Sequence, residues 1–114
     1  MAHVSTLITP YGMPIPVFAL GASQNVAYNA AGGASTESTA FGASTIAVLV
    51  STTTSDVRIS IGKRGSNSAS STTTLIPKPA IIVFQVPSGG SVAVLGNDTN
   101  TGSISVTELV SSTQ

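Results

Sequence analysis

Hydrophobic and polar residues alternate in short stretches along most of this chain, which is the pattern of half-buried β-strands. The clearest alternation places Val57, Ile59 and Ile61 on one face of a strand and Arg58 and Ser60 on the other. Other segments are rich in Val, Ile and Thr and end in Gly, Pro or Asn, as strands do. The expected strands cover residues 26–28, 36–41, 45–50, 56–61, 81–86, 91–95 and 103–109.

The residues between these segments predict how the strands connect. Residues 87–90 (Pro-Ser-Gly-Gly) are a tight-turn signal, so strands 81–86 and 91–95 are expected to form a hairpin. A Gly-Gly turn at 32–33 similarly suggests that 36–41 pairs back on 26–28. Segment 45–50 is apolar on both faces, as a central strand would be. Because no window shows helical periodicity, we expect an all-β fold, a single antiparallel β-sandwich or barrel of seven or eight short strands.

The first 20 residues differ from the rest, because Pro10, Pro14 and Pro16 are half of the six prolines in the chain. Proline excludes helix interiors and central strands, so this segment is expected to be an extended N-terminal arm, residues 1–20, before a β-sandwich domain, residues 21–114. Two interpretations remain open: an edge strand packed on its own domain, or an arm lying on a neighbouring subunit. In the second case the expected contact residues are Leu7, Ile8, Tyr11, Met13, Ile15 and Phe18.

Charge is unusually scarce, which limits the classes of partner. Charged residues make up 7% of the 114 positions, with four basic and four acidic residues and a net charge of zero; an ordinary soluble domain is about 25% charged. Ser and Thr supply 18 and 15 positions, so the surface is expected to be hydroxyl and amide. Nucleic acid and anionic membranes are not expected partners, because both require clustered Lys and Arg. No disulfide is possible without cysteine, and neither a membrane span nor a signal peptide is expected.

The sequence offers little chemistry, so we expect no enzymatic activity, no cofactor and no metal. His3 is the only imidazole and stands close to the N-terminus, and no Gly-x-Ser-x-Gly motif occurs. The four carboxylates, Glu37, Asp56, Asp98 and Glu108, are expected in or beside four different strands. A catalytic pair or a metal site would need several such groups to converge.

Glu108 and the polar segment 97–100 can each be interpreted in more than one way. Glu108 falls on the expected inward face of the last strand, where it could pair with Arg58, mark a fraying strand end or face a subunit contact; an edge position near solvent is the simplest interpretation. Asn97-Asp98-Thr99-Asn100 superficially resembles part of a calcium loop, but an Asx turn explains it better.

About half of the chain, residues 56–110, is similar to small virion structural proteins of tailed bacteriophages. The similarity lies in Val-Arg-Ile-Ser-Ile-Gly (57–62), Thr-Leu-Ile-Pro (74–77), the run from Ile82 to Gly96, and Gly-Ser-Ile-Ser-Val-Thr-Glu-Leu (102–109). Some of these proteins look like capsid decoration (cement) proteins. The resemblance implies a homotrimer that binds the major capsid protein on the virion surface after synthesis in the host cytoplasm. It implies no catalytic residues.

These observations predict a non-enzymatic capsid decoration protein whose arm contacts the shell. Deleting residues 2–18 should then leave a folded domain that no longer binds capsids. The first alternative is a tail, fibre or head–tail adaptor component of a phage. The second is a carbohydrate- or cell-surface-binding module that uses the polar loops at 62–73 and 96–102.

Overall fold

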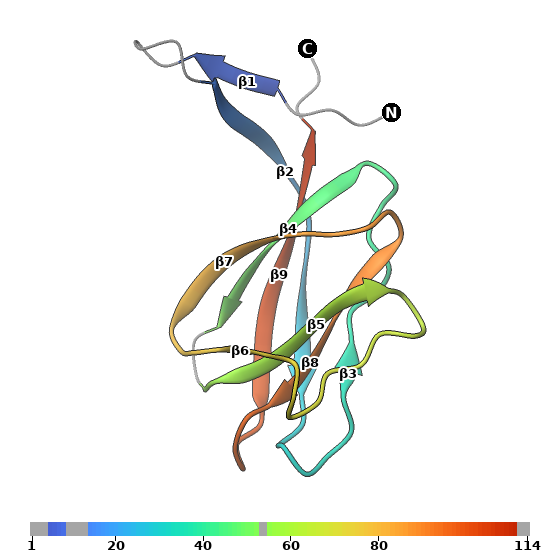
Figure 1. The fold of residues 1–114 in the computed structure, drawn as a ribbon, viewed down its shortest axis with the longest axis vertical. Coiled ribbons are helices and arrows are strands. Elements are labelled where there is room, and N and C mark those ends of the chain that lie inside the picture. Colours follow the sequence, from blue (N-terminus) through green and yellow to red (C-terminus); the bar gives the residue numbers. More distant parts are fainter. Residues whose placement is uncertain (1–4, 9–13, 53–54, 112–114) are drawn as a thin grey trace.

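The computed structural model describes residues 5–8, 14–52 and 55–111, which form two antiparallel sheets packed as a β-sandwich (Figure 1). One sheet has five strands in the order β1-β2-β9-β4-β7, and the other has four in the order β3-β8-β5-β6. The strand bounds are β1 Ser5–Ile8, β2 Pro14–Tyr28, β3 Thr36–Glu37, β4 Thr45–Thr52, β5 Val57–Lys63, β6 Thr74–Ile76, β7 Ala80–Gln85, β8 Gly90–Gly96 and β9 Gly102–Ser111. The predicted all-β antiparallel sandwich is confirmed.

The core lies between the sheets and is built from the alternating residues. In β5, Val57 and Ile59 are buried and Ile61 packs against the same cluster, as the alternation predicts. Ile104 and Val106 of β9, Val48 and Val50 of β4, and Val26 and Tyr28 of β2 supply the opposite face. The same cluster includes Ile76, Val92 and Val94 from the sheet of β5, and Phe41 and Val86 from connecting segments. In the part of the chain that the structure describes, no helix is long and apolar enough to cross a membrane.

Two predicted strand pairings are wrong. β7 pairs with β4, whereas β8 pairs with β5 and β3, so the turn at 87–90 carries the chain from one sheet to the other and closes no hairpin. The segment expected at 36–41 is strand only at Thr36–Glu37, and it pairs with β8 rather than with 26–28. The expected central position of segment 45–50 is confirmed, since β4 lies between β9 and β7.

β2 is much longer than the strand expected at 26–28, and it explains how the prolines fit. Among the residues that the structure describes, its first residues pair only with β1, with Thr6 opposite Pro16 and Ile8 opposite Pro14. Pairing with β9 begins at Phe18, opposite Ser111. Both prolines therefore lie where β2 has a neighbour on one side only, which is where a strand can lack an N–H donor.

Candidate functional site

The arm predicted from the sequence includes a hairpin that extends beyond the sandwich (Figure 1). Leu7 and Ile8 lie in β1, and Ile15 lies opposite Leu7 in β2. Phe18 stands where β2 begins to pair with β9. The imidazole His3 and the predicted contact residues Tyr11 and Met13 lie outside the residues that the structure describes. The structure thus brings Leu7, Ile8 and Ile15 together in one hairpin, and their role in contacting a partner stays a prediction.

The hairpin is joined to the sandwich by continuous strand. β2 passes without interruption through residues 20 and 21, the predicted boundary between arm and domain, and its pairing with β9 shifts register between Leu20 and Ser23. A shift of this kind is a β-bulge, which bends a strand and changes its twist. Leu20, just before the bulge, is 75% exposed. The junction therefore presents a large apolar side chain to solvent beside the hairpin.

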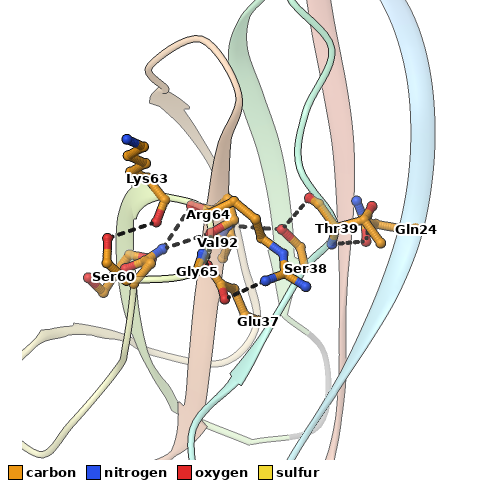
Figure 2. Close-up of polar contacts among 12 residues, drawn as sticks. Gln24, Glu37, Ser38, Thr39, Ser60, Lys63, Arg64, Gly65 and Val92 are labelled. Carbon is orange, nitrogen blue, oxygen red and sulfur yellow. Dashed lines mark hydrogen bonds and ion pairs between the residues drawn. The ribbon is translucent and has the colours of Figure 1, made fainter.

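A polar cluster around Glu37 fixes the loop after β5 to β3 and β8 (Figure 2). The carboxylate of Glu37 accepts hydrogen bonds from Ser91 Oγ at 2.5 Å, Gly65 N at 3.0 Å and Arg64 Nη1 at 3.1 Å. Gly65 has φ of +97°, a backbone conformation that glycine adopts without strain. The amide of Asn67 extends the same contact by donating to the carbonyl oxygens of Ser60 and Ser91, both at 2.9 Å.

A second set of hydrogen bonds involves the two residues that follow β3 (Figure 2). Ser38, which is buried, accepts a hydrogen bond from Val92 N at 3.0 Å and donates to the carbonyl of Thr39. Thr39 in turn donates through its backbone N to Gln24 Oε1 at 3.1 Å. These contacts connect β8 of the four-stranded sheet with β2 of the five-stranded sheet. The polar residues on this side of the sandwich therefore hold the two sheets together.

The hydrogen bonds to Glu37 stabilise its charged form. The donor hydroxyl of Ser91, then the amide of Gly65, and also the positive charge of Arg64, hold the pKa of Glu37 below its usual value near 4.5. A carboxyl whose pKa is lowered by folding contributes stability above its unfolded pKa, and that stability is lost as the pH falls through the folded pKa. The cluster therefore ties the loop 62–73 most firmly when Glu37 is ionised.

Replacing Glu37 by glutamine should lower the stability of the protein at pH 7, because the amide group cannot accept all three hydrogen bonds. The difference between wild type and Glu37→Gln should shrink as the pH falls from the unfolded pKa of about 4.5 through the lower folded pKa, where the carboxyl of the folded protein takes up a proton. Urea unfolding at pH 7 and at pH 3, followed by circular dichroism, measures both effects. Asp98→Asn removes the same charge from an exposed loop and should cost less at pH 7. An equal loss in the two variants would contradict the anchoring role.

Glu108 lies at one end of the sandwich and is not paired with Arg58. Its Oε1 accepts hydrogen bonds from Gly42 N at 3.0 Å and from the hydroxyl of Thr45. Arg58 donates instead to Asn97 Oδ1 at 3.0 Å and to the carbonyl of Thr73 at 3.1 Å. β9 continues to Ser111, so Glu108 does not mark the end of the strand. Of the three alternatives, the contact with another subunit is the one still open.

The loop after β8 is an Asx turn, as predicted. Asp98 Oδ1 accepts a hydrogen bond from Asn100 N at 2.8 Å, and its second oxygen contacts the Asn100 amide. Among the described residues, no three His, Cys, Asp or Glu side chains lie close enough together to hold a metal ion. In both loops considered for carbohydrate binding, 62–73 and 96–102, several polar groups therefore form hydrogen bonds within the protein.

Sequence reasoning missed the exposed edge strand β7. Ile81 and Val83 are 71% and 51% exposed, although the segment was expected to be half of a hairpin. Ile81, Val83 and Gln85 lie on one face of this strand, and Ile82 and Phe84 lie on the other. Because all of these residues except Gln85 are apolar, the sequence did not show which of the two faces is buried.

Comparison with known proteins adds no family to this description. The chain matches no protein-family model, no curated protein and no solved structure.

Proposed function

We propose that this chain is a non-enzymatic virion structural protein of the capsid decoration type, which binds the major capsid protein and stabilises the head. The observation that carries the proposal is the β1–β2 hairpin, which extends beyond the sandwich and bears Leu7, Ile8 and Ile15 on paired strands (Figure 1). A β-sandwich with a projecting hairpin of largely apolar sequence fits a protein that bridges neighbouring subunits of a shell. The sequence pattern of residues 56–110, which resembles that of small phage virion proteins, points to the same proposal.

The surface of the sandwich suits a protein that works in many packed copies. With a net charge of zero and 7% charged residues, copies of the chain repel one another little. Exposed apolar residues such as Leu20 lie beside the hairpin and would be covered by the shell. Each contact then adds a modest free energy, and repetition over symmetric copies makes the sum large. Such a protein would be made in the host cytoplasm and would end on the outer surface of the capsid.

Replacing Leu7 by aspartate should remove the chain from capsids while leaving the sandwich folded. Truncating an anchor residue at an interface costs about 2 kcal/mol or more, so occupancy at subsaturating concentration should fall at least about tenfold. Capsids of the parent virus assembled without this chain are incubated with the purified protein and sedimented, and bound copies are counted per capsid subunit. Wild type should approach one copy for each subunit or a simple fraction of that number.

Ser5→Asp is the matched control, since it adds the same charge to the same strand at a residue that was not predicted as a contact. This control should bind like wild type, and both variants should keep the wild-type circular dichroism spectrum. Full occupancy by Leu7→Asp would sink the proposed role of the hairpin. A count of only a few copies per virion would instead favour the tail, fibre or adaptor alternative.

A further inference from the structure

The outer edge of the five-stranded sheet is formed by β7, at the end opposite β1 (Figure 1). Among the described residues, β4 is the only strand that pairs with β7. Its sequence, Ala-Ile-Ile-Val-Phe-Gln, contains no charged residue and no proline. Natural sheets usually protect such an edge with charged side chains, proline or a bulge. β7 therefore presents an unprotected row of main-chain hydrogen-bonding groups.

The directions of these main-chain groups follow from two hydrogen bonds. Val86 N donates to Ile46 O at 3.2 Å, and Ala80 N donates to Thr52 Oγ1 at 3.2 Å, so residues at even positions direct their N–H toward β4. In an antiparallel strand the N–H and C=O of successive residues point alternately to the two sides. The N–H and C=O groups of Ile81, Val83 and Gln85 therefore point away from β4.

We propose that β7 pairs antiparallel with β7 of a second copy of this chain, around a twofold axis at Val83. The three outward residues are symmetric about Val83, so this register places Val83 opposite Val83 and Ile81 opposite Gln85. Each of these is a hydrogen-bonded pair with two N–H···O=C bonds, and every outward main-chain group of the strand finds a partner. Paired residues share a face of the sheet, so buried side chains stay on the buried face.

Charge at this edge favours a second copy as the occupant. A charged peptide would find no opposite charge on β7, while a neutral strand loses nothing by pairing with its own copy. The zero net charge of the chain adds no long-range repulsion between the two copies. On the outer face, Ile81 and Val83 of both copies would form one continuous apolar patch.

A groove beside the same edge would be covered by this pairing. It has a volume of about 380 Å³ and lies between β7 and the β5–β6 pair, with Ile59, Ile61 and Phe84 among its lining residues. Leu75 of β6, 39% exposed, stands on the neighbouring edge strand of the other sheet. The twofold axis brings the edge of the second copy alongside, so it removes apolar surface of both sheets from water.

This geometry predicts a dimer, because a contact between identical edges closes after two copies. The resemblance to decoration proteins implies a trimer, so the molecular mass in solution distinguishes the β7-paired dimer from that trimer. One strand pair covers less than the about 1,600 Å² of a standard interface. We therefore expect a dissociation constant of about 1–100 µM.

Val83→Lys tests the pairing by placing two ammonium groups opposite each other across the axis. Val83 is half exposed and its N–H faces away from β4, so the substitution should leave the monomer folded. Sedimentation velocity at rising concentration should show wild type approaching twice the 11.3 kDa of one chain. Val83→Lys should raise the dissociation constant at least about tenfold. Thr99→Lys, which adds the same charge to an exposed loop, should dimerise like wild type.

Cross-linking fixes the register, because the chain has no cysteine of its own. Paired Cα atoms in this register lie about 5.5 Å apart, so Val83→Cys should give covalent dimers quickly with a short bis-maleimide. Thr99→Cys should react far more slowly. A monomer at all concentrations, a trimer, or equal cross-linking of the two cysteine variants would overturn the inference. The inference would also be overturned if Leu7→Asp abolished self-association while Val83→Lys did not, because the contact between copies would then lie at the hairpin. Capsid binding is a separate measurement, so either proposal can fail alone.

Discussion

Replacing Ile104 by alanine should lower the free energy of unfolding by about 2–5 kcal/mol, a large part of the total stability of a small domain. Ile104 is 1% exposed and lies in β9, which β2 and β4 flank on both sides. Its side chain belongs to the cluster that joins the two sheets. Removing three carbons there leaves a cavity that strands held on both sides cannot close. Urea unfolding followed by circular dichroism measures the loss, and the melting temperature should fall by about 10–20 °C.

Ser103→Ala is the matched control, because Ser103 precedes Ile104 in the same strand and is exposed. Its effect should stay within about 0.5 kcal/mol. Because both variants place alanine in β9, the difference between their unfolding free energies measures the effect of removing a buried side chain. A loss below about 1 kcal/mol for Ile104→Ala would mean that this position does not lie in the core, and the inward face of β9 would have to be reassigned.

The alternation of apolar and polar residues was sufficient to predict the class of fold and much of the core. Val57 and Ile59 in β5, and Ile104 and Val106 in β9, face the core as that pattern predicts. A period of two is a local property of the strand, so it can be seen without knowing the partners. The prolines near the N-terminus predicted an extended segment outside the central strands, and Pro14 and Pro16 lie in the part of β2 that pairs with β1.

Strand pairing could not be predicted from the same signals. The Pro-Ser-Gly-Gly turn reverses the chain whether the next strand joins the same sheet or the opposite one. β8 illustrates the problem, since all of its residues from Gly90 to Gly96 are buried. Its inward residues Val92 and Val94 meet the core, while Ala93 and Leu95 are covered by Ala69 of the loop after β5. Such a strand is apolar on both faces, and its sequence does not specify a partner.

The candidate site depends on the same long-range information. Glu37 and Gly65 are 28 residues apart in the chain and meet only because β3 and β5 flank β8. The edge position of β7 likewise follows from the order of strands in its sheet. An apolar strand at the edge and one at the centre look alike in sequence. Proline is a local signal, so it marked the first residues as extended, but it did not predict that β1 and β2 pair as a hairpin.

The end of β8 makes a close backbone approach that a variant can test. Gly96 N donates to the carbonyl of Asn29 at 2.8 Å, which ties β8 to the chain just after β2. A Cβ on Gly96 would lie 2.9 Å from Asn29 O and 3.0 Å from Asn100 O. Both atoms belong to the backbone, so neither can move without shifting a loop. Only glycine fits between these two carbonyl groups.

Gly96→Ala should therefore destabilise the protein by about 1–3 kcal/mol, the usual cost of forcing atoms into a packed site. The loss should be visible as a lower urea midpoint in the same assay. Gly32→Ala is the matched control, because a Cβ there meets nothing within 4 Å. That control should be neutral, or stabilising by up to about 1 kcal/mol, since alanine restricts the unfolded chain. Equal stability of the two variants would contradict the close approach of Gly96 to the carbonyl groups of Asn29 and Asn100. The end of β8 would then have to lie farther from the chain that follows β2.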